Sequence, residues 1–415
     1  MGYRFGLDVD AAQPKRTRNG WAGAHGRLHE TDEEGSNDMK SLMDEIVIKG
    51  LRLRNRIVLP PLTTNYGSLE GKVTDAVIRF YTERARDVGM VILEATAVQA
   101  DGRIVPGSLG LWEDGQIDGM RRLAAAIKGL GAAAVVQLNH AGARCTPAGG
   151  ELQGASPSGV AFRPDVAPFP MTQQQIDTMA TAFASAAERA SQAGFDGVEI
   201  HGAHMYLISQ FLSPFTNHRD DRYGGDAAAR ATFARDVVRA SRERLGKEYP
   251  IVFRLNAIEN IEGGQTLGDA LVVSRILADE GVDALDVSLV SGCTWREVDG
   301  RQFPVCTSAF SKKQPSGANV SLTAALKTAA RLPVIAVGKL GDSMAAQEAV
   351  STSEIDMIAI GRQMIADPNA AGKILSGRSD EIDLCEECMT CFASLGHGKP
   401  LACKVNKDLP RIHES

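Results

Sequence analysis

The chain has 415 residues, of which 44% are hydrophobic and 23% charged, and its formal net charge is −6. This composition excludes a chain that is disordered over most of its length, and it argues against nucleic acid or an anionic membrane as the main partner. No stretch approaches the roughly 18 consecutive apolar residues of a membrane span, so we expect a cytoplasmic protein that is not bound to membranes.

The first 42 residues contain scattered charges among glycine and serine and lack an apolar run. They therefore do not match a secretory signal. We expect a disordered N-terminal extension over 1–42, followed by a folded domain over 43–380.

Eight short apolar runs occur in the next part of the chain, and each is followed by an amphipathic stretch. They are 56–59, 90–95, 133–138, 197–201, 251–256, 284–288, 333–337 and 357–360. Short runs rich in Val and Ile are typical of buried parallel strands. Strands alternating with helices predict an α/β fold with a parallel sheet, and eight such units close into a TIM (β/α)8 barrel. An open doubly wound sheet is the alternative.

Several intervals between these runs carry clear local signals. Thr172 followed by Gln175 is a capping box for a helix before the fourth strand. Three longer segments, 140–170, 213–226 and 290–319, each follow a predicted strand. They should lie at the C-terminal face of the barrel, where barrel enzymes carry their chemistry.

Two histidines and a tyrosine follow the fourth apolar run. His201 and His204 are three residues apart and Tyr206 comes two residues later, where the predicted strand ends. Two imidazoles and a phenol in this place can converge on one small molecule. A metal site is the alternative, but a carboxylate or third histidine at fixed spacing is missing. Each side chain taken alone could equally be packed in the core or at its rim.

This segment resembles the active-site signature of the old yellow enzyme family of flavin ene-reductases, and further motifs of that family occur in order from about residue 43 to 380. The matching stretches are 55–58, 60–63, 94–97, 137–142, 198–207, 210–214, 217–219, 223–225 and 361–362. The resemblance implies that His201 and His204 donate hydrogen bonds to the acceptor group of a small unsaturated substrate. It implies that Tyr206 gives a proton to the substrate, since a phenol carries its proton at neutral pH.

The same resemblance implies an FMN site. The residues that it assigns to FMN are Pro61, Leu62, Thr63, Ala95, Gln137, Arg254, Gly338, Gly361 and Arg362. The amide of Gln137 and the guanidinium of Arg254 would donate hydrogen bonds to the pyrimidine edge of the flavin. A salt bridge in the barrel mouth is the alternative for Arg254. The two glycines and Arg362 follow strands seven and eight, where barrels often hold phosphate. Because the expected flavin-facing positions 62 and 63 offer no thiol, we predict non-covalent FMN.

Four of the seven cysteines fall in a C-terminal segment, 381–415. Their spacing is Cys385-x2-Cys388-x2-Cys391-x11-Cys403. Three thiolates within seven residues and a fourth from a later loop suit a [4Fe–4S] cluster. Structural zinc is the alternative, although zinc more often uses two separated pairs of cysteines. The pattern also resembles the segment after the barrel in 2,4-dienoyl-CoA reductase and trimethylamine dehydrogenase.

These observations favour an FMN-dependent ene-reductase that acts on an enone, enal or enoyl thioester. An oxidative amine dehydrogenase or demethylase that passes electrons through the cluster is one alternative, and a non-catalytic flavin electron carrier is another. No G-x-G-x-x-G fingerprint follows a predicted strand. We therefore expect NAD(P)H to reduce the flavin directly, or a separate redox protein to supply electrons. A homo-oligomer is compatible with the sequence.

Overall fold

A computed structural model describes residues 39–146, 154–352 and 354–411 of the chain. The extension expected over 1–42 lies almost entirely outside the described residues. Leu42 is buried, and its backbone N–H donates to the side chain of Gln347 over 3.2 Å. The chain therefore joins the folded body by residue 42.

Eight parallel strands close into a barrel in the described part of the chain. In order around the barrel they are β3 (Ile57–Leu59), β4 (Met90–Ala97), β5 (Ala133–Asn139), β8 (Gly197–Gly202), β9 (Ile251–Glu259), β10 (Ala284–Val290), β13 (Val334–Val337) and β14 (Met357–Ala359). Each strand coincides with one of the eight apolar runs. The prediction of a TIM barrel is confirmed, and an open sheet is excluded because β14 pairs with β3.

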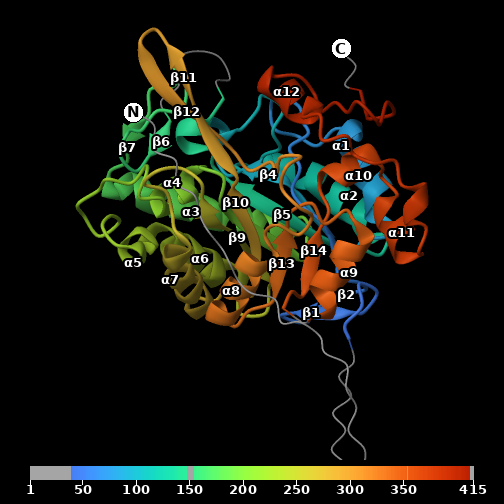
Figure 1. Cartoon of the computed structure of the whole chain (residues 1–415). Helices are drawn as coiled ribbons and strands as arrows, with labels where there is room; N and C mark the ends of the chain where they lie inside the picture. Colours follow the sequence, from blue (N-terminus) through green and yellow to red (C-terminus); the bar gives the residue numbers. More distant parts are fainter. Residues whose placement is uncertain (1–38, 147–153, 353, 412–415) are drawn as a thin grey trace, which may run out of the picture. The chain divides into compact units, whose positions relative to one another are not determined.

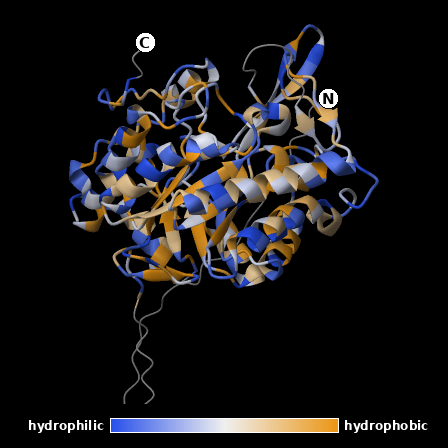
Figure 2. Ribbon diagram, turned by 180° about the vertical axis from the view of Figure 1, so that it is seen from behind, coloured by the Kyte–Doolittle hydropathy of each residue, from blue (hydrophilic) through white to orange (hydrophobic). Residues whose placement is uncertain are grey.

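Helices surround the strands. They are α1 (Asp75–Ala85), α2 (Ile117–Lys128), α3 (Gln173–Gln192), α4 (Leu207–Leu212), α5 (Ala227–Arg230), α6 (Thr232–Leu245), α7 (Leu267–Asp279), α8 (Val320–Ala330), α9 (Ser343–Ser351), α10 (Arg362–Ala366), α11 (Ala370–Leu375) and α12 (Thr390–Gly396). The predicted capping box of Thr172 and Gln175 begins α3. Figure 2 shows hydrophobic residues gathered on the central strands and mixed colouring along the surrounding helices. No helix among the described residues is long and apolar enough to cross a membrane.

Two hairpins lie at opposite ends of the barrel (Figure 1). At the N-terminal end, β1 (Ile46–Ile48) and β2 (Leu51–Leu53) place buried Ile48 and Leu53 against the apolar residues inside the barrel. Beyond the C-terminal end, β11 (Gly292–Val298) and β12 (Arg301–Thr307) form a longer hairpin. A short parallel pair, β6 (Ala155–Ser156) and β7 (Phe169–Pro170), lies in the loop that follows β5. The barrel is therefore closed at one end and open to a site at the other.

The turn of the longer hairpin explains why the chain reverses there. Asp299 and Gly300 connect the strands, and both have positive φ, 51° and 73°. A two-residue turn with both central residues in this region matches the right-handed twist of paired strands, and Asp-Gly is among its preferred sequences. The turn sets the register so that residues at equal distance from it lie opposite each other.

Candidate active site

A cavity of about 960 Å³ opens at the C-terminal ends of the barrel strands. All the side chains predicted for catalysis and for flavin binding line it. They are Pro61, Leu62, Thr63, Ala95, Gln137, His201, His204, Tyr206, Arg254, Gly338, Gly361 and Arg362. The structure thus brings together residues that are up to about three hundred positions apart in the chain.

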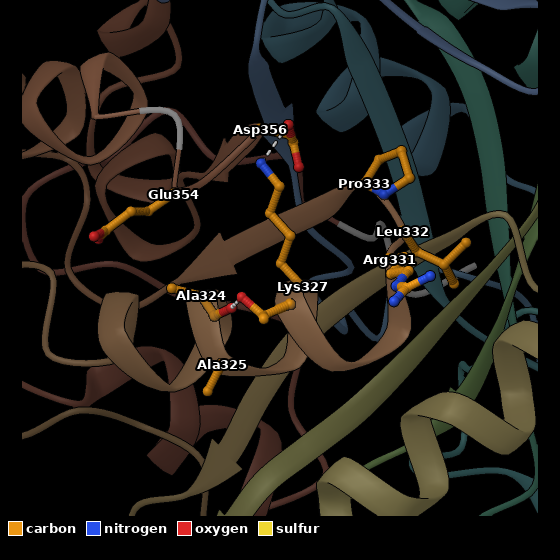
Figure 3. Close-up of a pocket in the computed structure, with 9 residues that line it drawn as sticks. Ala324, Ala325, Lys327, Arg331, Leu332, Pro333, Glu354 and Asp356 are labelled. Carbon is orange, nitrogen blue, oxygen red and sulfur yellow. Dashed lines mark hydrogen bonds and ion pairs between the residues drawn. The ribbon is translucent and has the colours of Figure 1, made fainter.

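A second hollow, of about 600 Å³, lies at the other end of β13 and contains none of these residues (Figure 3). Its walls come from the end of α8, the start of β13 and the residues just before β14. The ammonium of Lys327 pairs with the carboxylate of Asp356 over 2.9 Å, and this carboxylate also accepts from the backbone N–H of Val334. These contacts join α8 to the strands, so we interpret this hollow as a structural feature of the barrel's closed end.

The two predicted histidines lie next to each other, His201 buried and His204 partly buried. His201 is the last residue but one of β8, whereas His204 follows the strand in a left-handed conformation with φ of 63°. Their ring centroids are 4.9 Å apart. His204 Nε2 lies 2.7 Å from the hydroxyl of Ser288 on β10, and the buried Nδ1 of His201 has no hydrogen-bond partner among the described residues. The ring of His204 is therefore held by a hydrogen bond to β10, whereas Nδ1 of His201 has no such contact in the described part of the chain.

Burial sets the charge of these imidazoles. It lowers the pKa of His201 and of His204 well below the ordinary value, and the nearby guanidiniums of Arg254 and Arg144 lower it further. Both rings are neutral at pH 7 as a result. A neutral imidazole carries one N–H donor and one acceptor nitrogen, so each ring can donate one hydrogen bond.

Tyr206 completes this wall of the cavity. Its ring centroid lies 5.2 Å from that of His201. The guanidinium of Arg144 lies 5.1 Å from the centroid of the same phenol ring, and its Nη1 donates to the backbone carbonyl of His204. Arg144 therefore connects the loop after β5 to both the histidine and the tyrosine.

The floor of the cavity holds a buried charged cluster from four neighbouring strands. Gln137 donates to Glu199 over 2.6 Å, and Arg254 lies 3.5 Å from Asp286. Burial raises the pKa of Glu199 well above its ordinary value, and the charge of Asp286 adds to this effect. Burial likewise raises the pKa of Asp286. The salt bridge considered for Arg254 is present, and the same side chain also lines the cavity.

The strand ends on the opposite side of the cavity offer glycines and a cation. Gly338 has φ of 146°, and a Cβ there would lie 3.1 Å from the ring of Phe310. Arg362 begins α10, and its Nη2 donates to the carbonyl of Phe310 over 2.9 Å. Glycine at this place leaves the backbone accessible to a ligand. The lining thus fits a phosphate group, as expected for FMN.

The loop that carries Pro61, Leu62 and Thr63 is held from below by a buried glutamate. Glu94 on β4 accepts from the hydroxyl of Thr64 over 2.6 Å and from its backbone N–H over 3.0 Å. Burial raises the pKa of Glu94 to about 7, although these two hydrogen bonds oppose the shift. The position of this loop therefore depends on a carboxyl group that titrates near neutral pH.

The cysteine-rich segment lies beside the same cavity. Cys385 and Cys391 line it, and Cys388 is exposed. The segment is anchored to the loop after β3, because the backbone N–H of Leu401 donates to the carbonyl of Thr64 over 2.8 Å. Among the described residues, no group of three or more His, Cys, Asp or Glu side chains is arranged to hold a metal ion.

The residues that contact the two histidines or Tyr206 and were not predicted from the sequence include Arg144 and Ser288. Arg144 follows β5, and Ser288 lies near the end of β10. A charged residue just beyond the matched stretch 137–142 was a usable signal for Arg144. Nothing distinguished Ser288 from any other small residue in a buried strand, because its partner lies eighty-four positions away.

Comparison with known proteins agrees with this geometry. Residues 41–381 match the NADH:flavin oxidoreductase / NADH oxidase family. The chain is 37% identical to the NADH oxidase of Thermoanaerobacter brockii, over 84% of this chain and 52% of that protein. It is 35% identical to the NADPH dehydrogenase of Clostridium acetobutylicum, over 79% of this chain and 92% of that protein. The chain thus spans about half the length of the first relative and most of the length of the second.

A solved structure extends the comparison. A 2-naphthoyl-CoA reductase, in complex with 2-naphthoyl-CoA, matches with a TM-score of 0.81 and 26% identity. The match covers 89% of this chain and 57% of that one. The shared barrel therefore extends through most of the part of the chain that the structure describes.

Proposed function

The chain belongs to the NADH:flavin oxidoreductase / NADH oxidase family, and from this premise we propose that it is an FMN-dependent ene-reductase. Its substrate is a small molecule with a C=C bond activated by a carbonyl group, such as an enone, an enal or an enoyl thioester. One observation supports this most directly: two neutral imidazoles, one of them fully buried, share one wall of the cavity with a phenol.

The histidine pair binds the substrate's carbonyl oxygen. Because both rings are neutral, each presents a donor without placing a full positive charge in the site. Ser288 would donate to Nε2 of His204, so that Nδ1 carries the proton and is the donor of this ring. Donors aimed at an oxygen where negative charge develops are worth about 3 kcal/mol each in related acyl-transfer sites.

Tyr206 delivers the proton to the substrate's α-carbon. The guanidinium of Arg144 over its ring and the neighbouring ring of His201 hold the phenol at the cavity wall. General acid catalysis of this kind contributes about 10²- to 10⁴-fold. The hydride for the β-carbon is the chemistry that bound FMN supplies.

The residues around the cavity fit non-covalent FMN. Gln137 and Arg254 would hold the pyrimidine edge of the ring, and Arg362 with the backbone at Gly338 and Gly361 would hold the phosphate. Pro61, Leu62, Thr63 and Ala95 would pack around the ring system. We propose a non-covalent attachment because positions 61–63 and 95 carry no thiol. Flavin that stays on the acid-precipitated chain would contradict this.

We further propose that Cys385, Cys388, Cys391 and Cys403 hold a [4Fe–4S] cluster. All four thiols are free of disulfide bonds, and burial together with neighbouring thiols raises the pKa of both Cys385 and Cys391. A bound cation reverses such an effect, because thiolates are its ligands. The positive charge of Arg362 opposes this effect by lowering the pKa of both thiols. The cysteine-rich segment is therefore close in space to the expected phosphate end of the flavin site. Electrons would reach the site from NAD(P)H directly or through this cluster from a redox partner.

The two tryptophans that kept amine oxidation as an alternative do not line the cavity, although Phe162, Phe310 and Phe392 do. A cationic amine favours a bowl of aromatic rings. Trp112 and Trp295, which the sequence places after barrel strands, are absent from the described lining of the cavity. Trp295 is exposed on β11 and contacts Phe215 instead.

The test is turnover by the purified holoprotein. Protein reduced anaerobically with NADH or NADPH is mixed with a panel of α,β-unsaturated carbonyl compounds, and flavin reoxidation is followed by absorbance. We expect rapid reoxidation with at least one activated alkene and formation of the saturated product. Failure with the whole panel, together with reoxidation by an electron carrier, would refute the ene-reductase proposal.

A further inference from the structure

Two cysteines outside both predicted sites face each other across the hairpin β11–β12. Cys293 on β11 and Cys306 on β12 are directly opposite in the antiparallel register. Each lies five residues from the pair Val298–Arg301 that flanks the Asp-Gly turn. Their Sγ atoms are 2.6 Å apart. The register set by the turn therefore holds two thiols in contact.

We propose that Cys293 and Cys306 form a redox-sensitive dithiol that a hydroperoxide converts to a disulfide at the wall of the active-site cavity. Opposed residues of an antiparallel pair have Cα atoms about 4.5 to 5.5 Å apart. A disulfide requires a Cα separation of about 4.4 to 6.8 Å. The bond can thus form without moving the strands.

The surroundings distinguish the two thiols. Cys293 is half-buried at the hairpin surface, whereas Cys306 is buried and lines the cavity. Burial raises the pKa of Cys306 far above its ordinary value, and the adjacent Cys293 adds to this effect. Cys293 is therefore the thiol that reacts first, since it is the more accessible of the two and burial disfavours the thiolate of Cys306.

The reaction balances without another reactant. The thiolate of Cys293 attacks one oxygen of hydrogen peroxide, which gives a sulfenic acid and releases hydroxide. The thiol of Cys306 loses its proton and attacks that sulfur, so the S–S bond forms as a second hydroxide leaves. Two thiols and one peroxide thus give one disulfide and two water molecules.

The hairpin is connected to the residues proposed for catalysis. The backbone carbonyl of Cys306 accepts from Nη2 of Arg144 over 3.5 Å, and the same guanidinium contacts the carbonyl of His204 and the ring of Tyr206. Cys306 also packs with Phe162 and Met205 in a small apolar cluster. A disulfide at this pair would tie the two strands of the hairpin to each other and so restrict the movement of the part of the cavity wall that contains Cys306. We expect this restriction to change how substrate enters the cavity. That effect on substrate entry rests on the proposed function, whereas formation of the disulfide does not.

Trypsin provides a direct test, because it cleaves between the two cysteines. Cleavage after Arg275, Arg296, Arg301 and Lys312 puts Cys293 in the peptide 276–296 and Cys306 in the peptide 302–312. The intact holoprotein is treated with limiting hydrogen peroxide, alkylated, digested and analysed by mass spectrometry. We expect these two peptides to be joined, with a mass lower by two hydrogen atoms than their sum, and to be separated by dithiothreitol. Separate recovery of both peptides, each alkylated or overoxidised, would overturn the proposal.

Single variants test the order of reaction. In Cys306→Ser, dimedone should trap a sulfenic acid on Cys293, whereas in Cys293→Ser the same reagent should leave Cys306 largely unlabelled. Cys145→Ser is the matched control, because Cys145 is a buried thiol in the loop after β5 and its loss should leave the cross-link unchanged. Equal labelling of the two single variants would contradict the assigned order.

A kinetic measurement tests the effect on the cavity. In the wild-type protein, oxidation should change KM for an active alkene more than kcat, and Cys293→Ser should abolish this response to peroxide. An identical KM before and after complete cross-linking would refute control of substrate entry. The peptide result does not require turnover, so a failure of the ene-reductase proposal would be recognised separately.

Discussion

The buried carboxyl group of Glu94 should make the stability of the protein fall as pH rises through neutrality. Burial raises the pKa of Glu94 from its ordinary 4.5 to about 7. The folded protein therefore holds this proton more tightly than the unfolded chain does, and the resulting stabilisation is complete below pH 4.5 and is lost as pH rises through 7. Since each tenfold change in proton affinity is worth ~1.4 kcal/mol, the loss attributable to this group is about 3 kcal/mol.

The assay compares wild type with Glu94→Gln by urea unfolding of the holoprotein at a series of pH values. Other buried carboxyl groups titrate in both proteins, so the difference between the two isolates Glu94. We expect the wild type to lose about 3 kcal/mol relative to the variant between pH 4.5 and 8. The same exchange at exposed Glu262 is the control. A difference that stays constant with pH, or that changes in favour of the wild type, would refute the reasoning.

Three further predictions concern the site itself. Ser288→Ala should remove the hydrogen-bond partner of His204 Nε2 and lower kcat/KM for an alkene substrate by about tenfold, which corresponds to the loss of one net hydrogen bond. Circular dichroism should show unchanged folding, and unaltered kinetics would contradict the role of Ser288. Gly338→Ala should weaken FMN binding, because Gly338 has positive φ and the ring of Phe310 occupies the space that the added Cβ would need. Fluorescence titration of the apoprotein with FMN measures this, and wild-type affinity would contradict the prediction. Cys403→Ser should abolish the broad absorbance near 400 nm and lower iron content, and full iron content would contradict a four-cysteine cluster.

The barrel could be predicted from the sequence because the position of each strand along the chain depends on local sequence features. Short Val- and Ile-rich runs that alternate with amphipathic stretches can be recognised without knowing which strands pair, and all eight were found. The position of a side chain at the end of such a strand then predicts that it faces the common cavity. His201 was located in this way, whereas Gln137 and Arg254 lie at strand ends but were assigned through the family resemblance; the structure places all three in the cavity lining.

The hairpin beyond β10 was treated as an irregular segment, although Asp299-Gly300 between two alternating stretches is a usable hairpin signal. Its exposed residues Trp295 and Val305 lack the buried pattern by which the other strands were recognised. The two thiols on it showed no informative spacing, because Cys293 and Cys306 become neighbours only when the chain reverses. Cross-strand pairing is thus the main information that the linear sequence did not disclose.

The charged floor of the cavity shows how pairing also determines the chemistry. Arg254 and Asp286 lie on adjacent strands, and Glu199 approaches them from the other side of β9. If both carboxyl groups were ionised, the floor would carry a net negative charge. Burial raises the pKa of both Glu199 and Asp286, which favours their uncharged forms, whereas the guanidinium of Arg254 opposes this shift. An anionic group above Arg254 therefore meets less negative charge than two fully ionised carboxylates would present, which suits the pyrimidine edge of a flavin.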